Sequence, residues 1–189
     1  MLLQNKIIYS LLLFVIGLIA CDNRSDYRKA ADEIALKMGD AKNMNVGTDN
    51  YALYIPAGWI TDSLHAYGVD YFFLVAPKTK DDPNTNISVT TEFMQNLSLD
   101  VFKTLTIESV TNAIPSATIL EQGDIIANDL KGGWYSYSME SYGIKSTLVS
   151  YIFPKDGIAY TITAGTQTKD AARYRNTFDS VARSLKFIE

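Results

Sequence analysis

The sequence predicts an α+β domain, in which one helix interrupts a mainly antiparallel sheet and another helix closes it. Short segments that alternate polar and apolar residues, separated by two-residue turn signals, predict the strands. Two longer segments with apolar residues three or four positions apart predict the helices. The 189 residues are 47% hydrophobic and 12% aromatic, which is enough apolar material for one packed core. We place the domain at residues 50–189.

The first segment, residues 1–20, has the character of a lipoprotein signal peptide. Lys6 supplies positive charge, and residues 7–20 are almost wholly apolar. This run is shorter than the roughly 20 residues that a helix needs to cross a bilayer, and it fits the apolar region of a signal peptide. Leu18-Ile19-Ala20-Cys21 resembles the bacterial lipobox. The resemblance implies cleavage before Cys21, diacylglycerol on its thiol, and further acylation of the new amino terminus by a chain such as palmitate.

Lipid attachment at Cys21 determines the expected location. Two or more acyl chains are needed for lasting membrane binding, because a single chain binds only marginally. We therefore expect a protein of the bacterial cell envelope, anchored to the inner or outer membrane, with its domain in the periplasm. The alternative is an unmodified core cysteine within an uncleaved signal anchor.

The composition excludes several classes of function. The net charge is −4 and the isoelectric point is about 5.0, so a nucleic-acid partner is not expected. One cysteine excludes an internal disulfide, and one histidine excludes a zinc site with two imidazole ligands. We predict no cofactor and no metal.

The residues before the domain, 21–49, form a tether with one short amphipathic helix. Its apolar positions recur at the spacing of a helical face, and opposite charges four residues apart lie on the other side. These apolar positions are Tyr27, Ala31, Ile34 and Met38.

The first half of the domain alternates strands and loops. Residues 51–55 alternate apolar side chains on one face and end at Pro56, which predicts a strand. Residues 69–76 are apolar on both faces, as in the middle of a sheet, and residues 87–93 alternate again after a polar loop. Ser98 is a suitable N-cap for a helix over residues 99–113, which Pro115 follows.

The second half predicts a meander of four strands and a final helix. The strands cover about residues 118–126, 134–140, 146–153 and 158–164, with turns at Gly132-Gly133, Tyr142-Gly143 and Asp156-Gly157. The helix follows Thr168 or Asp170 as a cap. Its apolar face consists of Tyr174, Phe178, Val181 and Leu185.

The order of these segments resembles the PsbP-like superfamily. The likeness covers about residues 51–187 and rests on "YALYIPAGW", "NISVTTE", "GIAYTITAG" and "FDSVARSLKF". It implies an α/β/α sandwich around the antiparallel sheet. Relatives include an extrinsic photosystem subunit, small bacterial lipoproteins and a nuclear-import factor that binds a small GTPase, and they are largely not enzymes. The resemblance transfers no binding residue to this chain.

A hydrolase interpretation rests on Asp62, Ser63 and His65. In a strand, Ser63 and His65 share one face while Asp62 points the other way. A catalytic triad needs the acid to orient the imidazole that reaches the hydroxyl, and this spacing does not provide that. The sequence also lacks the glycine-flanked serine of a nucleophile elbow. We assign no catalytic residue.

Three further motifs have both a functional and a structural interpretation. Asp81 to Asn86 gathers oxygen ligands for calcium or manganese but lacks the spacing of an EF-hand, and turns use the same residues. The aromatic segment 132–143 places Tyr135, Tyr137 and Met139 on a core face, with Trp134 and Tyr142 available to a partner. Two tripeptides, starting at Asp62 and Asp179, resemble an O-glycosylation sequence of one bacterial phylum.

The sequence as a whole predicts a membrane-anchored, non-catalytic lipoprotein that binds or stabilises an envelope partner. The alternative is a carrier of a small ligand or metal, with a pocket between the sheet and the helices. A carboxylate-based hydrolase is the third interpretation, and a deep polar pocket with shifted carboxylates would favour it.

Overall fold

A computed structural model describes residues 51–66, 69–81 and 85–188 of the chain. The predicted signal peptide, Cys21 and the tether helix lie outside the described residues, as do residues 82–84 of the polar loop. The side chains of residues 63–66 and 69–71 are also outside the description.

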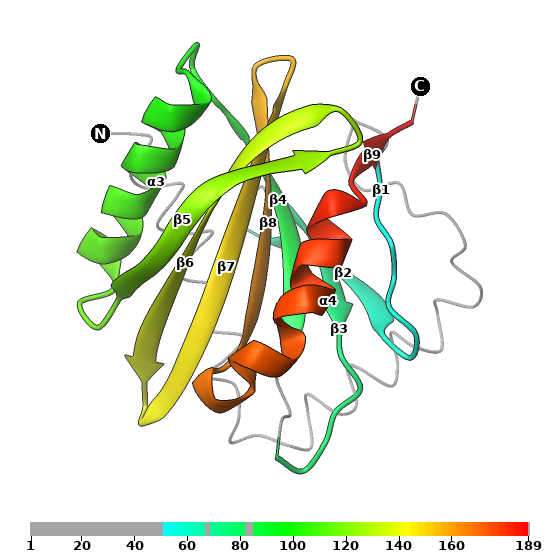
Figure 1. Cartoon of the computed structure of the whole chain (residues 1–189), viewed down its shortest axis with the longest axis vertical. Helices are drawn as coiled ribbons and strands as arrows, with labels where there is room; N and C mark the ends of the chain where they lie inside the picture. Colours follow the sequence, from blue (N-terminus) through cyan, green and yellow to red (C-terminus); the bar gives the residue numbers. More distant parts are fainter. Residues whose placement is uncertain (1–50, 67–68, 82–84, 189) are drawn as a thin grey trace.

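The core of the fold is an antiparallel sheet of seven strands in the order β2-β3-β4-β8-β7-β6-β5 (Figure 1). A second, two-stranded sheet joins β1 near the start of the domain to β9 at its end. The strands are β1 (Tyr51–Ala52), β2 (Ile60–Ala66), β3 (Val69–Val75), β4 (Asn86–Phe93), β5 (Thr118–Ala127), β6 (Leu130–Ser141), β7 (Ile144–Lys155), β8 (Ile158–Gln167) and β9 (Lys186–Phe187).

Two helices cover opposite faces of the large sheet. Helix α3 (Leu99–Ala113) packs on β5, β6 and β7, while α4 (Ala171–Arg183), after the short 3-10 helix η1 (Thr168–Asp170), packs on β5, β7 and β8. Strand β7 contributes to both layers, because Tyr151 belongs to the cluster under α4 and Ile152 to the cluster under α3. The chain therefore has the expected α+β fold, an α/β/α sandwich around an antiparallel sheet.

The four-stranded meander is confirmed, but one of its turns was misplaced. The turns fall at Asn128-Asp129, Tyr142-Gly143 and Asp156-Gly157, and all six residues have positive φ, as tight hairpins of this type need. Gly132 and Gly133 lie inside β6 instead. A Cβ on Gly132 would lie 2.5 Å from the Phe153 ring, so this glycine allows close packing between strands and makes no turn.

The start of the domain differs most from the sequence prediction. Only Tyr51 and Ala52 of the predicted strand over 51–55 pair with another strand, and their partner is the unpredicted β9. The chain then turns, with the Trp59 amide donating to the Pro56 carbonyl at 3.0 Å. Strand β2 was also not predicted, because its sequence lacks a clear apolar alternation.

Both helices predicted for the domain are confirmed. The Ser98 hydroxyl accepts a hydrogen bond from the Val101 amide, which is the expected N-cap of α3. Tyr174, Phe178, Val181 and Leu185 are all buried, although α4 ends at Arg183 and Leu185 follows it. The sequence therefore identified the apolar side of α4 correctly.

Candidate interaction surfaces

Helix α3 buries polar residues beside its apolar ones and leaves two apolar residues partly exposed on its outer side. Lys103, Thr106 and Ser109 are buried together with Phe102 and Val110. On the other side, Val101 is 47% exposed and Leu105, one turn further along, is 41% exposed. A helix that only covers a sheet normally shows the reverse distribution.

The inward polar groups of α3 have partners within the domain. The Thr106 hydroxyl donates to the Phe102 carbonyl at 2.8 Å. The Lys103 ammonium lies 3.9 Å from the carboxylates of both Asp100 and Asp124. The lysine stem passes over Gly133, where an added Cβ would lie 3.1 Å from the Lys103 Cδ. Val101 and Leu105 take no part in these polar contacts, and nearly half of each residue remains exposed.

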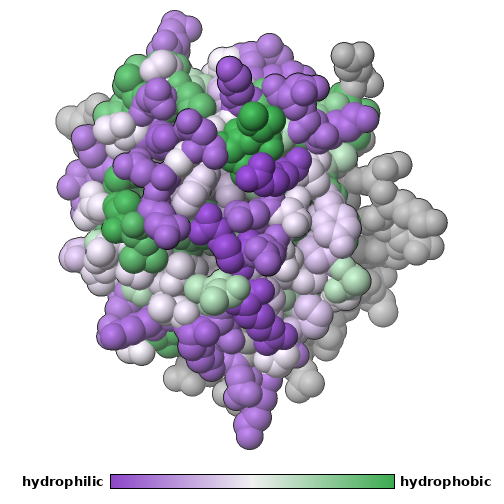
Figure 2. Space-filling view, viewed as in Figure 1, coloured by the Kyte–Doolittle hydropathy of each residue, from purple (hydrophilic) through white to green (hydrophobic). Residues whose placement is uncertain are grey.

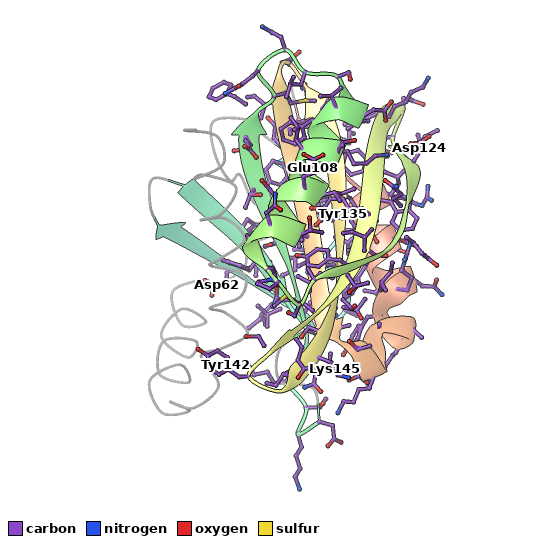
Figure 3. The ribbon with its side chains drawn as sticks, turned by 90° about the vertical axis from the view of Figure 1, so that its left-hand side faces the viewer. Asp62, Glu108, Asp124, Tyr135, Tyr142 and Lys145 are labelled. Carbon is purple, nitrogen blue, oxygen red and sulfur yellow. The ribbon has the colours of Figure 1, made fainter. Side chains whose placement is uncertain are left out.

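Acidic side chains flank this outward apolar pair. Asp100 and Glu108 are both exposed on α3, and Figure 3 shows Glu108 on the helix as it faces the viewer. The only basic residue of α3 is the buried Lys103. The outer face is therefore apolar at its centre and acidic at its margins, which suits a partner with an apolar groove and basic edges.

Two tyrosines lie between α3 and the sheet. The rings of Tyr135 and Tyr137 stack with centroids 6.0 Å apart, and both side chains are fully buried. Burial raises the pKa of Tyr135 to about 12, although its hydrogen bond with Ser150 opposes the rise. Burial also raises the pKa of Tyr137 well above its usual value. These phenols are core groups, as predicted for this face of the aromatic segment.

Helix α4 carries polar residues outward and a polar cluster at its contact with β5. The Arg175 Nε donates to both Asp179 carboxylate oxygens at 3.2 Å, and its Nη1 lies 3.7 Å from Glu121. The guanidinium lies 4.3 Å above the Trp134 ring. The Tyr151 hydroxyl donates to Asp179 at 2.5 Å, and burial, followed by this hydrogen bond, raises the pKa of Tyr151.

A cavity of about 220 Å³ lies beside this cluster, between α4 and the sheet. A bulge in β5 between Ile119 and Glu121 turns Leu120 and Glu121 toward it, and Arg175 and Phe178 line it from the helix. The polar groups facing it are mostly hydroxyls, so the cavity is a candidate site for a small ligand. Figure 2 shows this side of the molecule, where hydrophilic residues predominate and hydrophobic ones form separate small groups.

The residues of the hydrolase interpretation lie in strand β2. In the register of β2 with β3, Asp62 is opposite Phe73 and His65 is opposite Asp70. The side chains of Ser63 and His65 are outside the description. The labelled carboxylates Asp62, Glu108 and Asp124 lie apart on three elements in Figure 3.

The other predicted motifs have mixed outcomes. Tyr142 is 83% exposed at the tip of the β6–β7 hairpin (Figure 3), as expected for a partner contact. Trp134, however, is half-buried beneath Arg175. Ser180, in the second glycosylation-like tripeptide, is exposed on α4 beside Asp179, whose carboxylate is engaged.

Neither a metal cluster nor a membrane-spanning helix occurs in the described ranges. No three His, Cys, Asp or Glu side chains among residues 51–66, 69–81 and 85–188 are placed to hold a metal ion. The proposed ligand loop falls partly within 82–84, which are not described. None of the helices in these ranges combines the length and apolar character needed to cross a bilayer.

Comparisons with known proteins identify the fold. The sequence matches no family model and no curated protein at a significant level. Cyanobacterial PsbP from Synechocystis sp. PCC 6803 has a similar structure, with a TM-score of 0.58 and 14% identity, covering 82% of this chain and 99% of that one. LpqN, which is involved in cell envelope biogenesis of Mycobacterium tuberculosis, gives a TM-score of 0.58 and 11% identity, covering 80% and 87%.

A Pseudomonas aeruginosa protein of unknown function gives a TM-score of 0.56 and 10% identity, covering 67% of this chain and 96% of that one. All three identities are low, so the likeness concerns the fold alone. That fold is PsbP-like, as the order of segments in the sequence indicated.

Proposed function

We propose that this chain is a lipid-anchored protein of the bacterial cell envelope whose domain binds or stabilises a partner protein without catalysing a reaction. The observation that carries the proposal is the outward apolar pair on α3, Val101 and Leu105, which stays nearly half exposed while polar residues of the same helix are buried. The lipobox-like sequence at Cys21 supports the location. The PsbP-like fold of LpqN, from a protein of cell envelope biogenesis, is compatible with it.

The energetics favour a protein partner on this face. Burying a leucine or valine side chain contributes about 1.5–3 kcal/mol, and these two residues retain nearly half of that area for a second contact. Asp100 and Glu108 add charge at the margins, which contributes more to orientation and partner choice than to affinity. A partner with an apolar groove and basic edges fits both features.

The test is a site-specific crosslink in intact cells. A photoreactive residue replaces Leu105 on α3 in the full chain, and a matched control replaces Arg173, which is exposed on α4. We expect one reproducible envelope protein to be captured from position 105 and not from 173. Leu105→Asp should then abolish its co-purification with the native chain. Equal capture from both positions, or none from 105, would contradict the proposal.

The lipid anchor has an independent test. Mass spectrometry of the membrane fraction should show diacylglycerol on Cys21 and no peptide from residues 1–20. Cys21→Ser should remove the site of diacylglycerol attachment, so the variant should no longer be recovered as a lipid-modified protein of the membrane fraction. An unmodified thiol at Cys21 in membrane-derived protein would exclude the anchor and leave the α3 surface unaffected.

A small ligand in the 220 Å³ cavity beside α4 is the second candidate function. The observation that favours it is the combination of an apolar floor, which includes Phe178, with Arg175 at the edge of the cavity. A small uncharged polar compound of a few heavy atoms fits this size, because Asp179 and Glu121 already pair with the Arg175 charge. Calorimetry with a panel of small neutral alcohols and amides tests this idea, with Arg175→Met as the variant that should lose any binding observed.

A further inference from the structure

The domain begins and ends at the same place on the molecule. Tyr51 pairs with Phe187, and Ala52 with Lys186, so the chain that arrives from Cys21 enters beside β9. The ring of Tyr160 in the large sheet contacts both Tyr51, at a centroid distance of 6.0 Å, and Phe187, at 4.7 Å. The entry point is therefore fixed to the core, and we call this part of the domain the β1–β9 end.

The β1–β9 end carries a cluster of cations. Lys155 and Lys186 line a cavity of about 560 Å³ there, and the Lys155 ammonium lies 4.2 Å from the centre of the Phe187 ring. Arg183 reaches the neighbouring end of β5, where its Nη1 donates to the Ile126 carbonyl. Lys131 is opposite Ile126 in the strand register.

Among residues 51–66, 69–81 and 85–188, the carboxylates near these four cations are fewer. Asp129 lines the same cavity, and Asp156 occupies the β7–β8 turn directly after Lys155. The described part of this end is therefore locally cationic in a chain whose net charge is −4. Folding alone does not require a surface region whose charge is opposite in sign to the net charge of the chain.

Exposed apolar side chains accompany the cations. Ile126 is 57% exposed on β5, and Ile188 follows β9 at the C-terminus. Tyr54 is exposed near the end of α4, where its backbone amide donates to the Ser184 hydroxyl at 2.8 Å. Lysine and arginine beside tyrosine and aliphatic side chains are the composition of a surface that sits at the interface of a bilayer.

The tether alone does not hold this end at the membrane. Residues 22–50 number 29, and an extended chain of that length spans at most about 100 Å, so a lipid on Cys21 does not by itself dictate which side of the domain faces the membrane. A second, weak contact close to the entry point would fix one orientation, because the anchor keeps its effective concentration high.

We propose that the β1–β9 end lies against an anionic bilayer, with Lys131, Lys155 and Lys186 near lipid phosphates and Ile126, Ile188 and Tyr54 at headgroup depth. This inference rests on the proposed lipid anchor at Cys21. The β6–β7 hairpin, with Tyr142 at its tip, lies at the opposite end of the strands and points away from the membrane (Figure 1). The α3 surface then lies to the side, accessible to an envelope partner.

The experiment uses the lipidated full chain in vesicles of equal parts phosphatidylglycerol and phosphatidylcholine. Cys21 is the only native cysteine and the anchor occupies it, so a single introduced cysteine accepts a fluorophore selectively. One chain carries Ile188→Cys and the control carries Tyr142→Cys. We expect brominated lipid to quench the label at 188 at least three-fold more than the label at 142, and high salt or pure phosphatidylcholine to remove most of that difference.

Charge reversal sharpens the result. The double variant Lys155→Glu and Lys186→Glu should reduce the quenching at 188 several-fold. The control double variant, Lys145→Glu and Lys80→Glu, changes two lysines in other parts of the domain and should leave the quenching unchanged. Circular dichroism confirms that each variant is folded. Equal quenching at 188 and 142 in anchored protein overturns the proposed orientation alone. Protein that does not stay with the vesicles and reacts at the Cys21 thiol overturns the anchor instead.

Discussion

Helices α3 and α4 are similar in length, at 15 and 13 residues, and cover opposite faces of one sheet, yet they bury different kinds of side chain. Helix α4 turns Tyr174, Phe178 and Val181 inward. Helix α3 buries Lys103 and Thr106 and leaves Val101 and Leu105 outside. The two helices therefore differ in what they leave exposed, and the proposed partner contact rests on the apolar pair that α3 leaves partly exposed.

We expect the largest difference in the free energy of unfolding when one large apolar residue on each helix is replaced by alanine. Phe178→Ala should lower the free energy of unfolding by about 3–5 kcal/mol, because it leaves a cavity in the core. Leu105→Ala should lower it by only about 1 kcal/mol, because 41% of that residue is already exposed. Urea denaturation of both variants measures this. A loss above about 2 kcal/mol for Leu105→Ala would mean that α3 needs this residue for packing.

Alkaline pH tests the tyrosines on the two faces. Tyr51 and Tyr151 lie under α4, Tyr135 and Tyr137 lie under α3, and burial raises the pKa of all four. The folded state then holds protons that the unfolded chain releases near pH 10. Stability is therefore fully present below pH 10 and falls as the pH rises toward the folded-state values, by roughly 1.4 kcal/mol per pH unit for each tyrosine.

The variant Tyr135→Phe tests how much a tyrosine under α3 contributes to this loss of stability at alkaline pH. It removes one phenol, whose pKa in the folded state is about 12, and should reduce the loss of stability between pH 10 and 12. Denaturation at several pH values checks the slope. An unchanged slope would mean that Tyr135 ionises in the folded protein as easily as in water.

Each helix contacts the sheet through one cation, and replacing these two cations by methionine should have different costs in stability. Arg175→Met should cost about 2 kcal/mol, because it removes the bond to Asp179 and the contact with the Trp134 ring. Lys103→Met keeps the apolar stem over Gly133 and loses only two long ion pairs, so a change within about 1 kcal/mol is expected. Thermal unfolding of the two variants provides the measurement, and the opposite ranking would reverse our assignment of the two contacts.

The smallest expected difference is at the first turn of each helix. Ser98→Ala should cost about 1 kcal/mol, since the Ser98 hydroxyl accepts from the Val101 amide. Asp170 makes no side-chain hydrogen bond as the cap of α4, so Asp170→Ala should lose only a few tenths of a kcal/mol from its favourable charge near the helix N-terminus. Equal losses from the two substitutions would show that Asp170 caps α4 in solution.

Much of the fold was predictable because local signals agree with the tertiary structure. The Tyr142-Gly143 and Asp156-Gly157 turns, the Ser98 cap and the apolar side of α4 each depend on a few neighbouring residues. The prediction of a turn at Gly132-Gly133 was wrong. In the sequence, a glycine such as Gly132 that lets the Phe153 ring approach looks the same as a glycine that turns the chain. Strand β9 was missed because two residues carry too little pattern.

The candidate surfaces were less predictable. Tyr142 was identified from its place in a hairpin, but Arg175 and Asp179 had no signal beyond ordinary helix composition. The cluster they form requires Glu121, Trp134 and Tyr151, which come from three different strands.

The sequence by itself determined the α+β class, both helices and most strands, because periodicity and turn chemistry act over short distances along the chain. Only the tertiary structure decided which side of α3 faces outward, since the Lys103 stem packs over a glycine on β6 and its ammonium lies near carboxylates on two elements. It also brought the ends of the domain together, because β1 and β9 pair across more than 130 residues. Contacts between distant residues depend on the packing of the whole sheet, and no local pattern records them.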